Sequence, residues 1–284
     1  MRFDQVAISL VPRTTANCLD LALLILRRQA RPLLALWALI AIPACTLSYV
    51  LVDRFQCSLW TGLLIFLVAS SPLGVLAVMG VAPSTFGEPF SVRDVWRRLN
   101  SGGWRLLMTT QLLRIGAIFA GTVLCVIPGA LLAVRYGFLT EQFVLANLSK
   151  DLFDSNLKDL IKAEFTDLFA RSVWIAVFCG LLWVSLFMLA DGVGYYVLFG
   201  MGLITGRLTV DLQYREVSEA TASVVDFIWH DARVVTALVA CGLLVYLLGR
   251  LSWFLAYIDL RVRRDCWDME LQIIHEAERL ETVG

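Results

Sequence analysis

The chain has 284 residues, of which 59% are hydrophobic and 17% charged, and its mean hydropathy is +0.75. This balance excludes an ordinary soluble domain, in which about 25% of residues are charged, and predicts a polytopic membrane protein. The formal net charge is zero, which argues against a nucleic-acid-binding protein, because such proteins carry a strongly basic face.

The N-terminal segment, residues 1–32, does not have the order of a cleaved signal peptide. Asp4 and Asp20 precede the first apolar run, and arginines follow it. We therefore expect this segment to be retained and to form an amphipathic region on the cytoplasmic side of the membrane.

Six apolar runs are long enough to cross a bilayer, for which about 20 residues are needed. The fold class expected is thus an all-α transmembrane bundle over residues 33–258, followed by a cytoplasmic amphipathic tail, residues 259–284. A shorter run with three glycines, residues 195–210, is expected to re-enter the membrane or to lie at its surface, with a full crossing as the alternative. The six expected spans are residues 33–52, 59–82, 106–127, 130–148, 172–190 and 234–258.

The lysines and arginines indicate the orientation of the bundle. With a cytoplasmic N-terminus and six spans, 17 of the 24 basic residues fall in cytoplasmic segments, four in outer segments and three within spans. An excess of lysine and arginine marks the cytoplasmic side. We therefore expect both termini to be cytoplasmic.

Four short segments place Ser or Asn three residues before Asp: residues 17–20, 91–94, 156–159 and 223–226. Ser and Asn are good helix N-caps, and an acid in the first turn lies near the positive end of the helix dipole. The pattern predicts helix starts at these places. In the first three cases it also predicts an interfacial helix that bends into the next span, at Arg31, Arg105 or Arg171.

Ionisable residues inside a span are candidate functional sites, because they are costly in lipid. Arg114 lies in the third expected span and Glu141 in the fourth, and the tight turn at 127–130 makes these spans antiparallel neighbours. We expect Arg114 and Glu141 to form an intramembrane ion pair. The pair would belong either to an ion or substrate path or, as we favour, to the structural framework.

Three further charged residues of the spans have less definite roles. Arg135 has no partner that the sequence identifies, whereas Arg250 is near enough to the end of the last span to extend its side chain to the headgroups. Asp191, followed by Gly192, is expected to end the fifth span, because Asp–Gly is common in turns.

The sequence contains no recognisable catalytic or metal-binding motif. His230 and His275 are expected on opposite sides of the membrane, and none of the seven cysteines lies in a CxxC motif. We expect no enzyme activity, no cofactor and no metal, and we interpret the cysteines as small apolar residues.

Two amphipathic segments are expected at the cytoplasmic surface. Residues 150–169 place their apolar side chains on one helical face. In the tail, Arg261, Arg263 and Arg264 are expected to anchor the last span at the headgroups, since each basic residue near anionic lipid contributes about 1 kcal/mol.

Three segments resemble a loose family of bacterial multi-span proteins, which includes the membrane domain that precedes glycerophosphodiester phosphodiesterases and related actinobacterial and planctomycete proteins. They are FGEPFSVRDVWRRL, VIPGALLAVRYGF and YIDLRVRRDCWDMEL. The resemblance implies a membrane module of the bacterial inner membrane. It does not carry over the phosphodiesterase activity, because only residues 259–284 follow the last expected span. Where such relatives show RREGxDLEL, this chain has Cys266 and Trp267.

Taken with this resemblance, the sequence favours an accessory or scaffold subunit for other envelope proteins, with the lipid bilayer and other membrane proteins as partners. The alternative is a small transporter or lipid-handling protein that uses the region of Arg114 and Glu141 and the run 195–210. A transporter predicts a polar cavity that reaches the middle of the membrane, whereas a scaffold predicts a closed bundle with bound partners.

Overall fold

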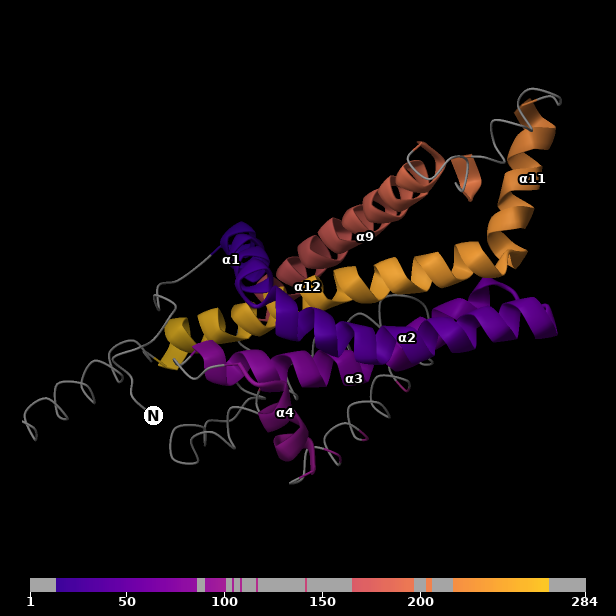
Figure 1. Ribbon diagram of the computed structural model, residues 1–284. Coiled ribbons are helices and arrows are strands. Elements are labelled where there is room, and N and C mark those ends of the chain that lie inside the picture. Colours follow the sequence, from indigo (N-terminus) through magenta and orange to yellow (C-terminus); the bar gives the residue numbers. More distant parts are fainter. Residues whose placement is uncertain are drawn as a thin grey trace, which may run out of the picture. The chain divides into compact units, whose positions relative to one another are not determined.

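The structure is a computed structural model and describes residues 14–85, 90–100, 104, 108, 116, 141, 165–196, 203–205 and 217–265. Within these residues it contains helices and no strand, in agreement with the expected all-α class (Figure 1). The helices are α1 (Thr15–Arg28), α2 (Ala30–Phe55), α3 (Leu59–Thr85), α4 (Val92–Arg98), α9 (Phe165–Tyr196), α11 (Val217–His230) and α12 (Ala232–Asp265).

Four of these helices are long and apolar enough to cross a membrane, which indicates a membrane protein. They are Ala30–Phe55, Leu59–Thr85, Phe165–Tyr196 and Ala232–Leu260, and they contain four of the six expected spans. Each extends beyond the apolar run that predicted it, because hydropathy marks the lipid-facing part of a helix whereas backbone hydrogen bonds continue past it. The expected spans 106–127 and 130–148 lie almost entirely outside the described residues.

The chain divides into two compact units, and the boundary falls within each of the four long helices. Unit 1 contains the described residues of Met1–Leu36, Gly74–Ala176 and Leu248–Gly284, and unit 2 contains those of Trp37–Leu73 and Val177–Leu247. Along the chain, α2 and α9 therefore begin in unit 1 and end in unit 2, whereas α3 and α12 begin in unit 2 and end in unit 1.

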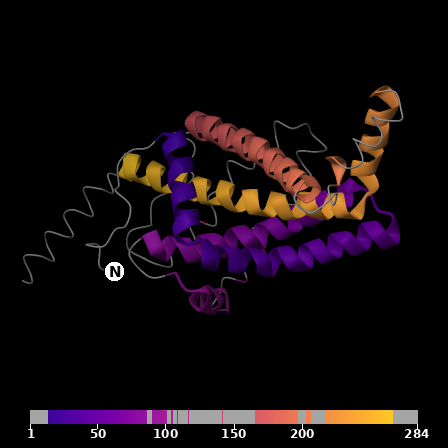
Figure 2. The same ribbon diagram turned by 45° about the horizontal axis from the view of Figure 1, so that its top comes forward.

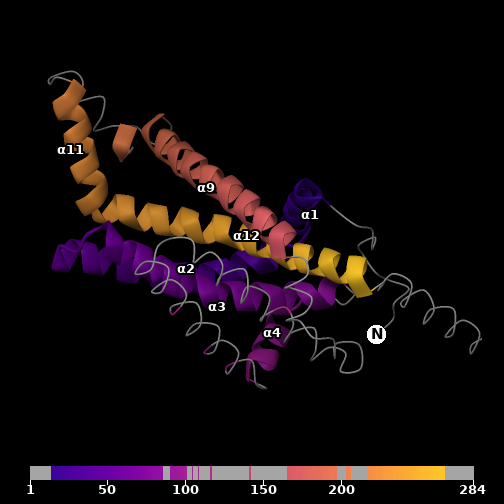
Figure 3. The same ribbon diagram turned by 180° about the vertical axis from the view of Figure 1, so that it is seen from behind.

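In unit 1, the amphipathic helix α1 lies close to the start of α9 (Figure 3). Its side chains Cys18, Ala22 and Ile25 are buried, at the three- and four-residue spacing of one helical face. Gln29 interrupts the helix before α2, and its side-chain amide donates a hydrogen bond of 2.8 Å to the hydroxyl of Ser84 near the end of α3. An amphipathic helix followed by a membrane-length helix is thus present at the first of the three places where this pair was predicted.

In unit 2, α2 and α3 form a helical hairpin, in which the two helices lie side by side (Figures 1 and 2). Gln56, with φ of 53°, ends α2 in the left-handed conformation. Val52, Ala232 and Val235 form a buried cluster on which Leu59 packs, so the end of α2 and the starts of α3 and α12 meet.

The predicted helix caps had different outcomes. Ser91 caps α4 and its hydroxyl accepts a hydrogen bond from the Asp94 backbone at 3.4 Å, as predicted. The prediction for 17–20 is wrong, because Thr14 caps α1 and Asn17 supplies the backbone N–H that this cap binds. The prediction for 223–226 is wrong as well, since this segment lies inside α11. Segment 156–159 lies outside the described residues.

Candidate functional site

The most deeply buried ion pair of the described residues joins α9 to α12 in unit 1. The Arg171 guanidinium donates from Nη1 to Oδ2 of Asp259 at 2.6 Å, and its Nε lies 2.8 Å from Oδ2 of Asp167, one turn earlier in α9. The Asp259 side chain is 1% exposed and that of Asp167 is 48% exposed. The sequence predicts Arg171 at the cytoplasmic start of a span, and it indicates no role for Asp259.

Only a weak signal for this pair is present in the sequence. Asp259 follows a long apolar run directly, where an unpartnered acid would be costly, and Arg171 starts another such run. The two residues are 88 positions apart, so only the packing of α9 against α12 reveals that they are partners.

A second buried ion pair contains Glu141, one of the two residues expected to pair within the membrane. Its partner in the structure is Arg250 of α12, whose Nη2 lies 2.7 Å from Oε1 and donates a hydrogen bond of 2.8 Å to Oε2. The expectation that Arg250 extends to the headgroups is therefore wrong, because its side chain is largely buried against a carboxylate. Arg114 and Arg135 lie outside the described residues, so an Arg114–Glu141 contact stays a prediction.

Oε1 of Glu141 accepts no hydrogen bond from the described part of the chain, although a positive nitrogen lies close to it. A single guanidinium nitrogen thus lies between both carboxylate oxygens instead of forming the parallel two-bond arrangement that arginine prefers. The pair neutralises the charge of both residues.

Asp191 binds the backbone of a neighbouring segment in unit 2. Its Oδ1 accepts hydrogen bonds from the N–H groups of Leu203 and Ile204, and its Oδ2 accepts from the N–H and the hydroxyl of Thr205 at 2.8 and 2.6 Å. The expectation that Asp191 ends the helix is wrong, since α9 continues to Tyr196. In an apolar surrounding, the helix retains its own hydrogen bonds and the Asp191 side chain holds another segment.

Ile204 packs the described part of the 195–210 run against the helices of unit 2. It forms a buried cluster with Phe187 of α9 and Val234 of α12, on which Val224 and Phe227 of α11 also pack. Residues 203–205 therefore lie beside the end of α9, in the same unit as the start of α12. The three glycines of this run lie outside the described residues.

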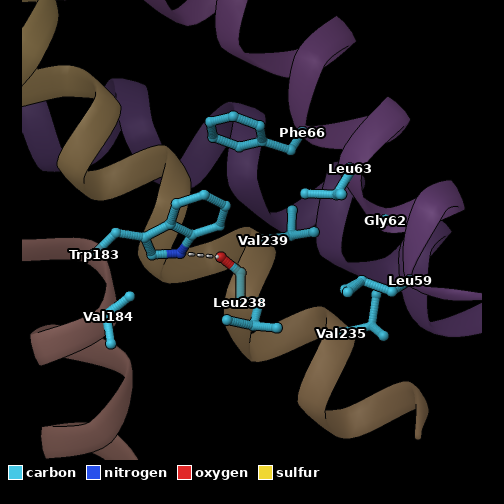
Figure 4. Close-up of a pocket in the computed structure, with 9 residues that line it drawn as sticks. All are labelled: Leu59, Gly62, Leu63, Phe66, Trp183, Val184, Val235, Leu238 and Val239. Carbon is cyan, nitrogen blue, oxygen red and sulfur yellow. Dashed lines mark hydrogen bonds between the residues drawn. The ribbon is translucent and has the colours of Figure 1, made fainter. Parts of the chain in front are cut away.

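An apolar pocket of about 160 Å³ lies in unit 2 (Figure 4). It is bounded by α3, α9 and α12, and the described side chains that line it are all hydrophobic. Because Val184 is 57% exposed, the pocket opens on the outer surface of unit 2. The lining residues are Leu59, Gly62, Leu63, Phe66, Trp183, Val184, Val235, Leu238 and Val239.

Two glycines shape this pocket. A Cβ at Gly62 would lie 2.3 Å from Cγ1 of Val235, so α3 approaches α12 closely only because residue 62 has no side chain. A Cβ at Gly242 would lie 3.0 Å from the Trp183 ring and 3.1 Å from the Phe66 ring. The two rings therefore rest against the backbone of α12.

The aromatic wall of the pocket is fixed in place. The rings of Trp183 and Phe66 stack with centroids 5.4 Å apart, and Tyr246 meets Phe66 edge-on at 6.3 Å. The indole N–H of Trp183 donates a hydrogen bond of 2.9 Å to the carbonyl oxygen of Leu238 (Figure 4). The indole N–H of Trp183 is thus already bonded within the protein.

The remaining predicted residues are placed as follows. The backbone of α12 includes Arg261, Arg263 and Arg264. Their side chains, and the whole of His275, are outside the described part of the structure. His230 ends α11, where its Nδ1 lies 3.1 Å from the Asp226 carboxylate, and both side chains are exposed. Five cysteines are described, and Cys18 among them is fully buried.

Comparison of this chain with protein-family models, with curated proteins and with solved structures finds no match. The bundle and its buried polar pairs are therefore interpreted from their own geometry.

Proposed function

We propose that this chain is a non-catalytic accessory or scaffold subunit of a bacterial inner membrane, which binds a transmembrane helix of another envelope protein on the outer face of α9. The observation that carries the proposal is the unequal burial of the long helices. Only 11% of the most apolar stretch of α9 is buried, against 67% of that of α3.

The inner and outer faces of α9 in unit 2 differ in a regular way. Trp183, Phe187 and Asp191 recur every four residues and contact α12 or residues 203–205. The opposite positions are exposed and apolar, and they include Leu181 and Met188. Such a helix contacts lipid or another helix along its whole length.

A row of small residues at the edge between the inner and outer faces of α9 supports a partner helix in addition to lipid. Ser172, Ala176 and Gly180 follow one another at four-residue spacing, which allows two helix backbones to approach closely. A Cβ added at Gly180 would meet no other atom within 4 Å. The space beside Gly180 is therefore open to a partner.

The described polar groups support a structural role. Arg171 with Asp259, Arg250 with Glu141, and Asp191 with residues 203–205 each satisfy a charge inside the protein. The described pocket is lined only by apolar side chains, which favours contact with lipid over passage of a polar solute. The transporter alternative rests on the expected Arg114–Glu141 region and on the run 195–210.

A photo-crosslinking side chain at Leu181, introduced in intact membranes, tests the proposal. We expect a discrete product with a second protein, and we expect Gly180→Leu to abolish it without lowering the thermal stability of the purified chain. The same crosslinker at Leu73, which is fully buried, serves as the control and should give no such product.

Two results would contradict the scaffold proposal. One is a product in which Leu181 is joined to residues 101–164 of the same chain, which would show that this chain covers its own helix. The other is a crosslink to a second protein that Gly180→Leu leaves unchanged.

A further inference from the structure

We propose that the apolar pocket of unit 2 holds the acyl chain of a bilayer lipid. The pocket is bounded by three helices that carry no polar side chain toward it, and its opening lies beside Val184 on the outer face of α9. The inference rests on insertion of unit 2 in the bilayer and not on the binding of a partner to α9.

The position of the pocket along α3 suits the part of an acyl chain that is nearest to the lipid headgroup. It extends from Leu59, the first residue of the helix, to Phe66, which is about 10 Å at a rise of 1.5 Å per residue. Next to Leu59, the exposed Trp60 lies 5.8 Å, centroid to centroid, from Trp229 of α11. Tryptophans of this kind mark the level of the headgroups.

Polar and charged residues lie at the same end of unit 2. The loop between α2 and α3 follows Asp53 and Arg54, and Asp231 caps α12 by accepting hydrogen bonds from the N–H groups of Arg233 and Val234. A lipid whose headgroup lies at this level would place its acyl chain beside Leu59 to Phe66.

The pocket has the size and character of a dry site. A cavity of about 150 Å³ lined by Leu, Ile and Phe excludes water and accepts a hydrocarbon ring, and this pocket is slightly larger. An empty pocket would deprive its lining atoms of contacts. Within a bilayer, an acyl chain is the apolar group always present at high concentration, so it is the natural occupant.

The rigidity of the pocket distinguishes it from the general lipid surface. Trp183 is held by its hydrogen bond to Leu238 and by the ring of Phe66, and Gly242 brings both rings against α12. A preformed wall loses little conformational entropy when a chain binds. The bound chain should therefore exchange more slowly than its neighbours in the bilayer.

The test uses the full chain in vesicles of phosphatidylethanolamine and phosphatidylglycerol that contain a phosphatidylcholine with a diazirine in the upper half of one acyl chain. After illumination, mass spectrometry locates the adducts. We expect labelling of Leu63 and Phe66 to exceed that of the exposed Leu181, which serves as a reference for ordinary lipid contact.

Val184→Phe should block the opening and lower the labelling of Leu63 and Phe66 about fivefold, equivalent to about 1 kcal/mol of binding free energy. The matched control is Val177→Phe on the same helix, since Val177 is 49% exposed and does not line the pocket. It should leave the labelling unchanged. Val184→Ala, which widens the opening and introduces no bulk, should retain the labelling.

Three results would overturn the acyl-chain proposal. The first is equal labelling in the Val184→Phe and Val177→Phe variants. The second is a loss of labelling in Val184→Ala. The third is labelling of Leu63 and Phe66 below that of Leu181 in the unmodified chain, which would show that a protein side chain fills the pocket. Loss of the Leu181 crosslink to a partner has no bearing on these results, so the scaffold and lipid proposals fail separately.

Discussion

At the scale of single residues, the two carboxylates around Arg171 provide an internal comparison. Asp259 and Asp167 bind the same guanidinium at 2.6 and 2.8 Å, but the first is buried and the second is half exposed. Coulombic attraction at similar distances is much stronger in a dry interior than beside water. The difference in burial, rather than the distance, should decide what each contributes to stability.

We predict that Asp259→Ala lowers the free energy of unfolding by about 3 to 5 kcal/mol, because it removes the buried one of the two carboxylates described at the Arg171 guanidinium. Asp167→Ala should lower it by less than about 1 kcal/mol, as for other exposed pairs. Unfolding in mixed micelles measures both. Replacing the pair with apolar residues, Arg171→Met together with Asp259→Leu, should restore much of the loss, and equal effects of the two Asp variants would refute this account.

At the scale of helices, close contact in unit 2 depends on a residue without a side chain. Gly62 of α3 faces Val235 and Val239 of α12, whereas Gly180 of α9 faces open space. Both positions are helical, so an alanine at either improves the intrinsic helix propensity by a similar amount. Packing alone distinguishes them.

We predict that Gly62→Ala lowers the free energy of unfolding by about 1 to 3 kcal/mol through overpacking against Val235, while Gly180→Ala leaves it unchanged or raises it slightly. A double-mutant cycle with Val235→Ala provides the control, because removing the clashing methyl groups should make the effect of Gly62→Ala smaller. If the cycle shows no coupling, the two residues are not in contact.

At the scale of the whole molecule, the ends of the long helices alternate between the units, so the described chain starts and finishes in unit 1. Unit 1 contains Arg27, Arg28, Arg93 and Arg97. In unit 2, by contrast, the basic residues have acidic residues such as Asp53 and Asp231 close to them in sequence. From the positive-inside rule, we propose that unit 1 lies at the cytoplasmic side.

We predict that a membrane-impermeant maleimide labels Cys57, in the loop between α2 and α3, in spheroplasts with an intact inner membrane. A cysteine at position 93 (Arg93→Cys), in α4 of unit 1, should react only after the membrane is opened; each is tested as the sole cysteine. A phosphatase fused at Gly284 should be inactive. Activity there would show an odd number of crossings and would make residues 195–210 a full span.

The sequence by itself determined the class of protein, because twenty consecutive apolar residues have few stable alternatives to a helix in lipid. It located four long helices and the cap at Ser91, where the signal is local. It did not locate the caps at Thr14 and Asp231, since Ser, Thr, Asn and Asp are frequent near helix starts and only the final hydrogen bond selects one.

Only the tertiary structure decided which buried charges meet. Glu141 lies 109 positions from Arg250, and Arg171 lies 88 from Asp259, so each pair depends on how distant helices pack and rotate. The pocket likewise depends on how helices pack. Gly62, Trp183 and Leu238 line it together, but no pattern within their own helices indicates that they meet. Helix formation in lipid follows from local composition, whereas pairing and cavities follow from the contacts between helices, which no local pattern contains.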